Sequence, residues 1–251
     1  MRLFAAFCYY MAASFAATPA PAQYVGCEGP ILKASYTRPT DRYDHGILGD
    51  AIEWGGMKVV IDWADGCGLV GPIDIILPQE SVYEDFAPRL WDVTGDGQPE
   101  IVTVISKVSS GASLEIHGFA GNRFTAIAST PYIGTPHRWL APVGAADLDG
   151  DGRVEIAYVE TPHLGKILKI VRLEGDRLVP VAEAKGLTNH RIGDPFIQGR
   201  IATCGGSPTI LTSNGDWTRI IGTTLADGKL AVRDLGPYRG PKSFDRIAGC
   251  R

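Results

Sequence analysis

Alternating acids give the segment 147–156 (DLDGDGRVEI) the clearest chemical character in this sequence. Calcium takes about six to eight oxygen ligands in proteins, at about 2.3–2.6 Å. In a tight loop, side chains at every second position turn to the same concave side, and a glycine after the third acid permits the sharp bend. The segment therefore predicts a calcium site, with ligands from the carboxylates of Asp147, Asp149, Asp151 and Glu155 and the main-chain carbonyl of Arg153.

Two alternatives to this calcium loop exist. An EF-hand is a poor match, because its twelfth position is Tyr158 rather than glutamate and the β-rich sequence VEIAYVE follows where a helix is needed. An Asx-type turn between two strands, with no ion, is the second alternative. Such a turn leaves three clustered carboxylates that repel one another, which favours the calcium interpretation.

An earlier acidic loop has a related pattern (DVTGDGQPEI, 92–101). Thr94 stands where the later loop has an acid, so this loop holds one negative charge less, and a plain turn is the alternative. The sequence thus predicts one calcium ion at the later loop and leaves open a second ion here. Its candidate ligands are Asp92, Thr94, Asp96 and Glu100.

Both loops belong to a repeated segment, which starts at Ala87 (APRLWDVTGDGQPEIVTVIS) and again at Ala141 (APVGAADLDGDGRVEIAYVE). Asp92 and Asp147 are equivalent and lie 55 residues apart (147 − 92). Each copy holds four short apolar runs separated by Gly, Asp or Asn turns, as in β-hairpins. The strands are expected at 89–92, 100–106, 112–119 and 123–128 in the first copy, and at 143–147, 154–160, 166–173 and 177–182 in the second.

A strand-rich repeat of this length is typical of propeller blades. Weaker copies on either side bring the total to about four blades, with five as the alternative. Segments 31–37 and 242–251 are left to close the ring. The sequence therefore predicts an all-β fold, namely a small β-propeller with four-stranded blades.

The segments DVTGDGQPEI and DLDGDGRVEI resemble the acidic loops of FG-GAP/VCBS repeat proteins, the integrin-alpha-like β-propellers. The resemblance is specific over 88–108 and 142–160. With PTDRYDHGILGD and LTNHRIGD, the chain is also similar to small exported VCBS-repeat proteins of bacteria. The resemblance implies a propeller, calcium in the acidic loops and a role in binding, and it does not imply an enzyme.

Segments rich in histidine and arginine precede the first strand of each expected blade: RYDHG, YEDFAPR, PHRWL and NHRIGD. In a propeller these connectors share one face, opposite the acidic loops, so a ligand site is predicted there. Its candidate residues are His45, Arg89, His137, Arg138, Trp139, His190 and Arg191. The alternative is structural pairing with acids of the same segments, Asp44, Glu84, Asp85 and Asp194. His117 and His163 have no partner at an informative spacing.

The predicted function is a non-enzymatic binding module for a protein or glycan. Arginine and histidine suit an anionic or carboxylate-bearing ligand, and Trp139 offers a ring for stacking. A periplasmic hydrolase or lyase that uses His137, Arg138 and His190 is the alternative. The sequence holds no common nucleophile, zinc-protease or nucleotide motif, and its formal net charge of −4 argues against nucleic acid as a partner.

Residues 1–22 predict a secretory signal peptide, because Arg2 precedes an apolar run and Ala20-Pro21-Ala22 fits a cleavage site. An uncleaved membrane anchor is the alternative. Cleavage near Ala22–Gln23 leaves one domain, 23–251, without a transmembrane segment and in the periplasm or outside the cell.

Four cysteines remain in that mature chain, and two disulfides are expected in an oxidising compartment. The favoured pairs are Cys27–Cys67 and Cys204–Cys250, because each ties down one end of the chain. Other pairings and free buried thiols are the alternatives.

Overall fold

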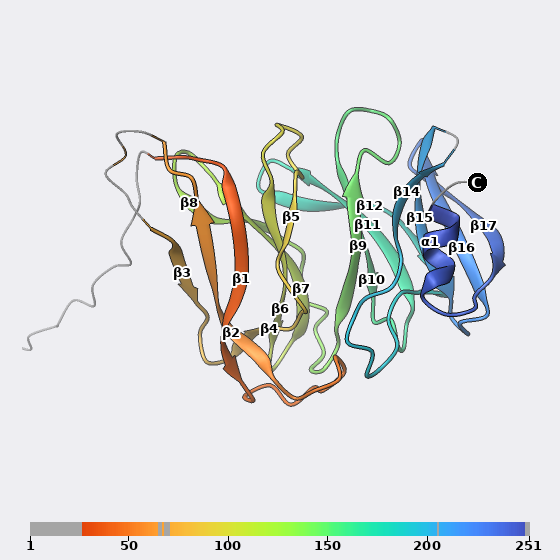
Figure 1. The fold of residues 1–251 in the computed structure, drawn as a ribbon, viewed down its shortest axis with the longest axis horizontal. Helices are drawn as coiled ribbons and strands as arrows, with labels where there is room; N and C mark the ends of the chain where they lie inside the picture. The colour runs from red at the N-terminus through yellow and green to blue at the C-terminus, as the bar shows by residue number, and fades with distance from the viewer. Residues whose placement is uncertain (1–26, 65–66, 68–70, 205, 249–251) are drawn as a thin grey trace, which may run out of the picture.

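The computed structural model describes residues 27–64, 67, 71–204 and 206–248, which form seventeen β-strands and one short α-helix. The all-β fold predicted from the sequence is confirmed. Figure 1 shows the strands in consecutive antiparallel groups that follow one another along the molecule. The predicted signal peptide lies outside the described residues. Among the residues described, no helix has the length and apolar character to cross a membrane.

The first two groups of strands form one eight-stranded sheet. The first group consists of β1 (Ile31–Thr40), β2 (Glu53–Ile61) and β3 (Ile73–Ile76). The second is a meander of β5 (Arg89–Trp91), β6 (Glu100–Lys107), β7 (Gly111–Phe119) and β8 (Phe124–Ser129). The short strand β4 (Ser81–Tyr83) pairs with both β2 and β6 and therefore joins the two groups.

The third and fourth groups are separate sheets. The third is a meander of β9 (Leu140–Ala146), β10 (Glu155–Glu160), β11 (Ile167–Glu174) and β12 (Arg177–Lys185). The fourth contains β13 (Leu187–Thr188), β14 (Arg200–Cys204), β15 (Ser207–Asn214), β16 (Arg219–Ala226) and β17 (Lys229–Pro237). Strand β9 begins three residues earlier than predicted, because Leu140 and Ala141 are buried and pair with β10.

A β-bulge recurs in the last strand of three successive groups. The register shifts leave one residue without a partner each time: Ile127 in β8, Val181 in β12 and Leu235 in β17. These residues are spaced by 54 positions in both steps (127 to 181, 181 to 235). Bulges are specific features of individual strands and do not recur by chance at equal spacing. The bulge in β17 therefore extends the repeat to the fourth group, beyond the two copies that are obvious in the sequence.

Hydrophobic clusters lie between consecutive groups and stack them. Each fully buried aliphatic side chain of these clusters contributes about 1.5–3 kcal/mol relative to an exposed one. Residues that share a cluster across neighbouring groups include Val59 with Ile101, Leu114 with Leu140, and Val159 with Ile210. The same stacking holds the turns and connectors at fixed positions along the two edges of the molecule.

The ends of the described chain have their own partners. Strand β1 pairs with β2, and α1 (Lys242–Ala248) is a helix whose Phe244 shares a cluster with Leu211 and Ile220. Among the described residues, no strand pairing joins the first group to the last, as closure of a ring by these segments would need. A disulfide joins Cys27 to Cys67, whereas Cys250 of the second expected pair lies outside the described residues.

Candidate functional site

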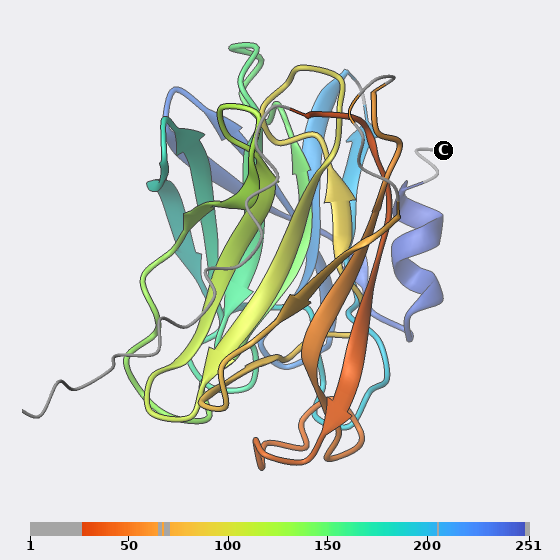
Figure 2. The ribbon, with the colours of Figure 1, turned by 90° about the vertical axis from the view of Figure 1, so that its left-hand side faces the viewer.

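The acidic loops and the connectors lie at opposite edges of the molecule. The acidic loops link β5 to β6 and β9 to β10, and the loop after β9 is at the upper edge in Figure 1. The segment between β1 and β2, which contains His45, is at the lower edge in Figures 1 and 2. This separation follows from the antiparallel meanders, because successive turns alternate between the two edges of a sheet.

The later acidic loop gathers three carboxylates. Oxygens of Asp147, Asp149 and Asp151 lie within 4.8 Å of one another. Oxygens bound to one calcium ion at about 2.3–2.6 Å are at most about 5 Å apart, so this spacing fits the ion. Asp147 also closes the turn, because it accepts hydrogen bonds from the N–H groups of Gly150 (2.7 Å) and Gly152 (2.9 Å). Both glycines have positive φ, 80° and 85°, which side-chain-bearing residues rarely adopt.

A guanidinium group, which residue spacing along the chain did not indicate, contacts the inner side of this loop. Arg172 on β11 pairs in register with Glu155 on β10 and donates hydrogen bonds to its carboxylate. The same guanidinium lies 3.1 Å from Asp149 and 3.2 Å from Asp151. The side chains of Glu155 and Arg172 are only 0% and 8% exposed. Glu155 also accepts the N–H of Leu148 at 2.8 Å, so this predicted calcium ligand already has protein partners.

A second arginine lies on the outer side of the same loop. The guanidinium of Arg153 is 2.8 Å from Asp151 and 3.5 Å from Glu174. Its hydrogen bonds hold the pKa of Asp151 below the usual value. The role of the Arg153 carbonyl as a calcium ligand stays a prediction.

The earlier acidic loop forms a similar turn. Asp92 accepts hydrogen bonds from the N–H groups of Gly95 (2.7 Å) and Gly97 (2.9 Å). The carboxylate of Glu100 accepts the N–H of Val93 at 2.9 Å and the hydroxyl of Thr94 at 3.3 Å. Burial raises the pKa of Glu100, although these hydrogen bonds oppose the shift.

The surroundings of the earlier loop differ from those of the later one. Gly118 on β7 lies beside Glu100, so that a Cβ atom there would be 3.0 Å from Cγ of Glu100. Across the described ranges, no basic side chain forms an ion pair with Asp92, Asp96 or Glu100, and the three carboxylates do not gather as those of the later loop do. A cavity of about 460 Å³ opens beside Glu100 and Gly118.

Four of the five histidines gather at the lower edge of the molecule. The rings of His45 and His137 stack with centroids 5.1 Å apart, and those of His163 and His190 are also 5.1 Å apart. A cavity of about 240 Å³ lies beside them, which we call the histidine pocket. Its lining includes His45, His137, Arg138, Trp139 and His163, with apolar side chains from Ile47, Leu164 and Ile192.

Main-chain contacts position the connector that carries three of these residues. The N–H of Ala112 on β7 donates to the carbonyl of Arg138 at 2.8 Å. Gly111 has φ 71°, and a Cβ atom there would lie 2.4 Å from the carbonyl oxygen of Thr135, so the approach requires glycine. His137 adopts φ 54°, a conformation that costs about 1–3 kcal/mol and is frequent at functional sites.

Trp139 packs behind the imidazoles. Its side chain is 2% exposed, and its Nε1–H donates to the carbonyl of Glu84 at 2.8 Å. The indole stacks on His163 with an interplanar angle of 17° and meets His190 edge-on at 5.0 Å. The indole therefore positions two histidines, whereas its place in a connector predicted a ring face that is open to a ligand.

Hydrogen bonds fix the tautomers of His163 and His190. His190 Nε2 lies 2.9 Å from the carbonyl oxygen of Asp194, which only accepts, so this nitrogen carries the hydrogen. In neutral His190, Nδ1 is then an acceptor, and His163 Nε2–H donates to it at 2.9 Å. Neutral His163 therefore keeps an unprotonated Nδ1. Burial and then the neighbouring His190 lower the pKa of His163 to about 4, and burial lowers that of His190.

The imidazole of His45 contacts a buried carboxyl group. His45 Nδ1 lies 2.5 Å from Glu84, which also accepts the hydroxyl of Ser106. Burial raises the pKa of Glu84 well above its usual value and lowers that of His45, which Arg138 lowers further. Both directions favour an uncharged pair, in which Glu84 donates to Nδ1 and His45 keeps its Nε2–H. Glu53, 1% exposed, is also neutral at pH 7, because burial raises its pKa to about 9.

Two arginines predicted for this site lie elsewhere. Arg89 forms an ion pair with the buried carboxylate of Asp85, as the structural alternative expected. Arg191 stacks over Trp217 and Tyr238, with its guanidinium carbon 4.6 Å and 5.0 Å from the ring centroids. The structure thus brings together His45, His137, Arg138, Trp139 and His190, and it leaves Arg89 and Arg191 with partners of their own.

His163 joins the pocket although its sequence spacing gave no reason to select it. It lies in the turn between β10 and β11. In a four-stranded meander, this turn shares its edge with the connector that enters the first strand. The topology of the expected blade therefore held a signal for His163 that residue spacing alone did not.

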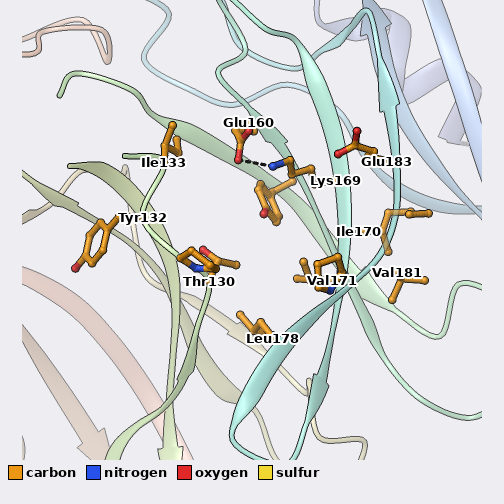
Figure 3. A pocket seen from close by; sticks show the side chains of 14 residues that line it. Thr130, Tyr132, Ile133, Glu160, Lys169, Ile170, Val171, Leu178, Val181 and Glu183 are labelled. Carbon is orange, nitrogen blue, oxygen red and sulfur yellow. Dashed lines mark hydrogen bonds and ion pairs between the residues drawn. The ribbon is translucent and has the colours of Figure 1, made fainter. Parts of the chain in front are cut away.

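A larger cavity, of about 490 Å³, lies between the segment after β8 and the strands β10, β11 and β12 (Figure 3). Its walls are mostly apolar, with Ile133, Val171 and Leu178 among the lining side chains. Glu160 and Lys169 form an ion pair of 2.8 Å at its margin. The charges of this ion pair compensate each other, and the carboxylate of Glu183 also lines the cavity.

Comparison with known proteins supports the repeat. Residues 92–158 match a protein family described as FG-GAP-like repeat, and both acidic loops lie in this stretch. The resemblance to FG-GAP repeats is therefore confirmed over this part of the chain. No curated protein matches the sequence.

Two solved structures have weak similarity to this fold. One is the rhamnogalacturonan lyase YesW, with a TM-score of 0.39 and 15% sequence identity over 75% of this chain and 43% of that one. The other is the rhamnogalacturonan lyase PL11 of Bacillus licheniformis, with a TM-score of 0.40, 15% identity and the same coverage of both chains. This chain spans less than half the length of these lyases.

Proposed function

We propose that this chain, which carries an FG-GAP-like repeat over residues 92–158, is an exported calcium-binding module that recognises a ligand without chemical conversion. Its strand groups serve as the blades of a small β-propeller, and the ligand binds in the histidine pocket. The disulfide between Cys27 and Cys67 supports an oxidising location, the periplasm or the outside of the cell.

The convergence of distant residues on one cavity carries this proposal. His45, Arg138 and His163 come from three segments far apart in the chain, and all three line the histidine pocket. Concave sites with a few convergent polar groups in apolar walls are the usual places for ligands. The positive φ of His137 adds a strained position in the same wall.

The pocket favours an anionic ligand, such as a carboxylate-bearing glycan or protein segment. Two of the acids beside it are neutralised or engaged elsewhere, because Glu84 is buried with a raised pKa and the carboxylate of Asp194 binds Gln198 at 2.8 Å. A third acid, Asp44, is exposed and acts on His45. Among the described residues that line the cavity, Arg138 alone carries a permanent charge, and guanidinium groups pair well with carboxylates.

The proposed calcium ion binds at the later acidic loop, with a stabilising rather than a catalytic role. The carboxylates of Asp147, Asp149 and Asp151 support it, because their oxygens already have the spacing of a calcium shell. A second ion at Asp92, Thr94, Asp96 and Glu100 has less geometric support, since those carboxylates are not gathered.

Replacement of Arg138 by alanine tests the ligand site, with Arg191→Ala as the matched control. A glycan array that includes uronic acids measures binding, and thermal melting measures stability. Arg138→Ala should lose binding at an unchanged melting temperature. Arg191→Ala should keep binding and melt a few degrees lower, because it loses its stacking on Trp217. A wild-type protein that binds no acidic glycan or peptide, with both variants less stable, would leave only structural roles.

A hydrolase or lyase remains the second candidate, because the structure contains an oriented imidazole. His163 donates through Nε2 to His190 and keeps Nδ1 as a proton acceptor, the arrangement of a general base. Its pKa of about 4 makes that base weak at neutral pH. Turnover of uronic-acid oligosaccharides by the wild type, lost in His163→Gln, would favour the enzyme over the binding module.

A further inference from the structure

Besides His137 and Thr161, the histidine pocket is lined by one imidazole that donates, one imidazole that accepts and one permanently charged guanidinium. The donor is Nε2–H of His45, because Nδ1 of that ring is bound to Glu84. The acceptor is Nδ1 of His163, because Nε2–H of that ring is bound to His190. The charge belongs to Arg138, which lines the same cavity.

A carboxylate does not match the acceptor on His163 without an added proton. Its oxygens are acceptors only, so they pair with Arg138 and His45 but repel the lone pair on His163. We propose that the histidine pocket binds a carboxylate together with one proton from solvent, and that Nδ1 of His163 holds this proton. Three hydrogen-bond donors then face the bound group. The inference rests on the proposed ligand site and adds a coupling between ligand binding and pH.

The neighbours of His163 explain why the proton arrives only with the ligand. Burial, followed by His190, His45 and Lys166, disfavours a positive charge on this ring, and a hydrogen bond with the backbone of His190 opposes only part of this effect. The nearby acids give little compensation, because Asp44 acts on His45 and Asp194 on His190. A ligand carboxylate brings the missing negative charge into contact, so it raises the pKa of His163 from its free value of about 4.

The sign of the pH dependence follows from this shift. Below the free pKa of His163, the ring is protonated with or without ligand and contributes no pH dependence to the affinity. Between the free and the ligand-bound pKa, the complex holds one more proton than the free protein. In that window each unit of rising pH weakens binding about tenfold.

Histidine-detected NMR titration of the mature chain tests the coupling. Acetate and D-glucuronate serve as probes at four values from about pH 5 to about pH 8, with D-glucose as the uncharged control. The expected result is a Kd for both anions that rises about tenfold per pH unit between the free and the ligand-bound pKa of His163, together with a raised pKa for His163. His117, on β7 and outside the pocket lining, serves as the internal reference.

The variant His163→Gln separates the proposal from its alternatives. It keeps Arg138 and His45, so it should bind acetate more weakly and without the pH slope. A slope that persists in this variant would place the proton on another group and overturn the role of His163. A wild-type Kd that does not change with pH would overturn the coupling but leave the ligand site. Absence of binding by either anion at every pH, with Arg138→Ala equal to wild type, would overturn both.

Discussion

The acidic loops at 92–100 and 147–155 have the same turn and different surroundings. In both loops, the first aspartate accepts hydrogen bonds from the N–H groups of two glycines. On the neighbouring strand, however, Arg172 contacts the later loop and Gly118 lies beside the earlier one. The later loop therefore has a formal charge of −2 (four acids, two arginines), and the earlier loop has −3 (three acids, no ion-paired base among the described residues).

The number of acids alone does not predict which of the two loops binds a cation more tightly. Asp149, Asp151 and Glu155 all contact Arg172, and an opposite charge between carboxylates reduces their mutual repulsion. The guanidinium thus helps to gather the oxygens that fit calcium, while it also lowers the attraction for a cation. The earlier loop retains more charge, and its carboxylates stay apart.

Replacement of Arg172 by methionine should have the largest effect. Without the guanidinium, Glu155 stays buried with no counter-charge, so the metal-free protein should lose about 3 kcal/mol of unfolding free energy. Urea denaturation in the presence of a chelator measures this loss, and calcium should restore part of it. The control is Arg153→Met, whose partner Asp151 is 35% exposed, with an expected loss below about 1 kcal/mol. Equal losses in the two variants would contradict the role given to Arg172.

Calcium should stabilise the wild type through the later loop. A calcium concentration one hundred times the dissociation constant adds about 2.7 kcal/mol to the unfolding free energy, because the ion binds the native state and not the unfolded chain. Asp149→Ala should lose most of this gain, whereas Asp96→Ala, the control in the earlier loop, should keep it. Superimposable melting curves in calcium and in chelator would show that neither loop binds the ion.

The substitution Thr94→Asp should turn the earlier loop into a stronger cation site. It adds the acid that the later loop has at this position, and calcium affinity rises with the charge of the ligands. We expect calcium to bind the earlier loop about tenfold more tightly, equivalent to about 1.4 kcal/mol. Isothermal titration calorimetry measures the change, with Thr94→Asn as the uncharged control. The same affinity in both variants would mean that geometry, rather than charge, limits this loop.

The substitution Gly118→Arg should have the smallest effect of the four. It introduces a guanidinium beside Glu100, as Arg172 stands beside Glu155, and should reduce the calcium response of the earlier loop by less than about tenfold. Gly118→Ala measures the steric cost separately, because a Cβ atom lies 3.0 Å from Cγ of Glu100. A calcium response that is larger in the arginine variant than in the alanine variant would contradict the electrostatic argument.

Strand positions in the two clear repeats were predictable, because apolar runs and turn residues are local signals. The predicted strands 100–106 and 112–119 agree closely with β6 (Glu100–Lys107) and β7 (Gly111–Phe119). The early start of β9 at Leu140 was not predictable, because those first residues are fixed by pairing with β10. The helix α1 was also missed, since a seven-residue segment gains its stability from packing Phe244 on the last sheet.

Local sequence was enough to specify the turns of both acidic loops and the presence of histidines in the connectors. Alternation of acids with glycine acts over a few residues, so it needs no distant partner. Tertiary structure decided which charges those residues meet. Arg172 reaches Glu155 only through the register of β10 and β11, and His163 reaches His190 only because one turn and one connector share an edge. The physical reason is that charge and proton positions depend on neighbours across strands, which residue spacing along the chain does not specify.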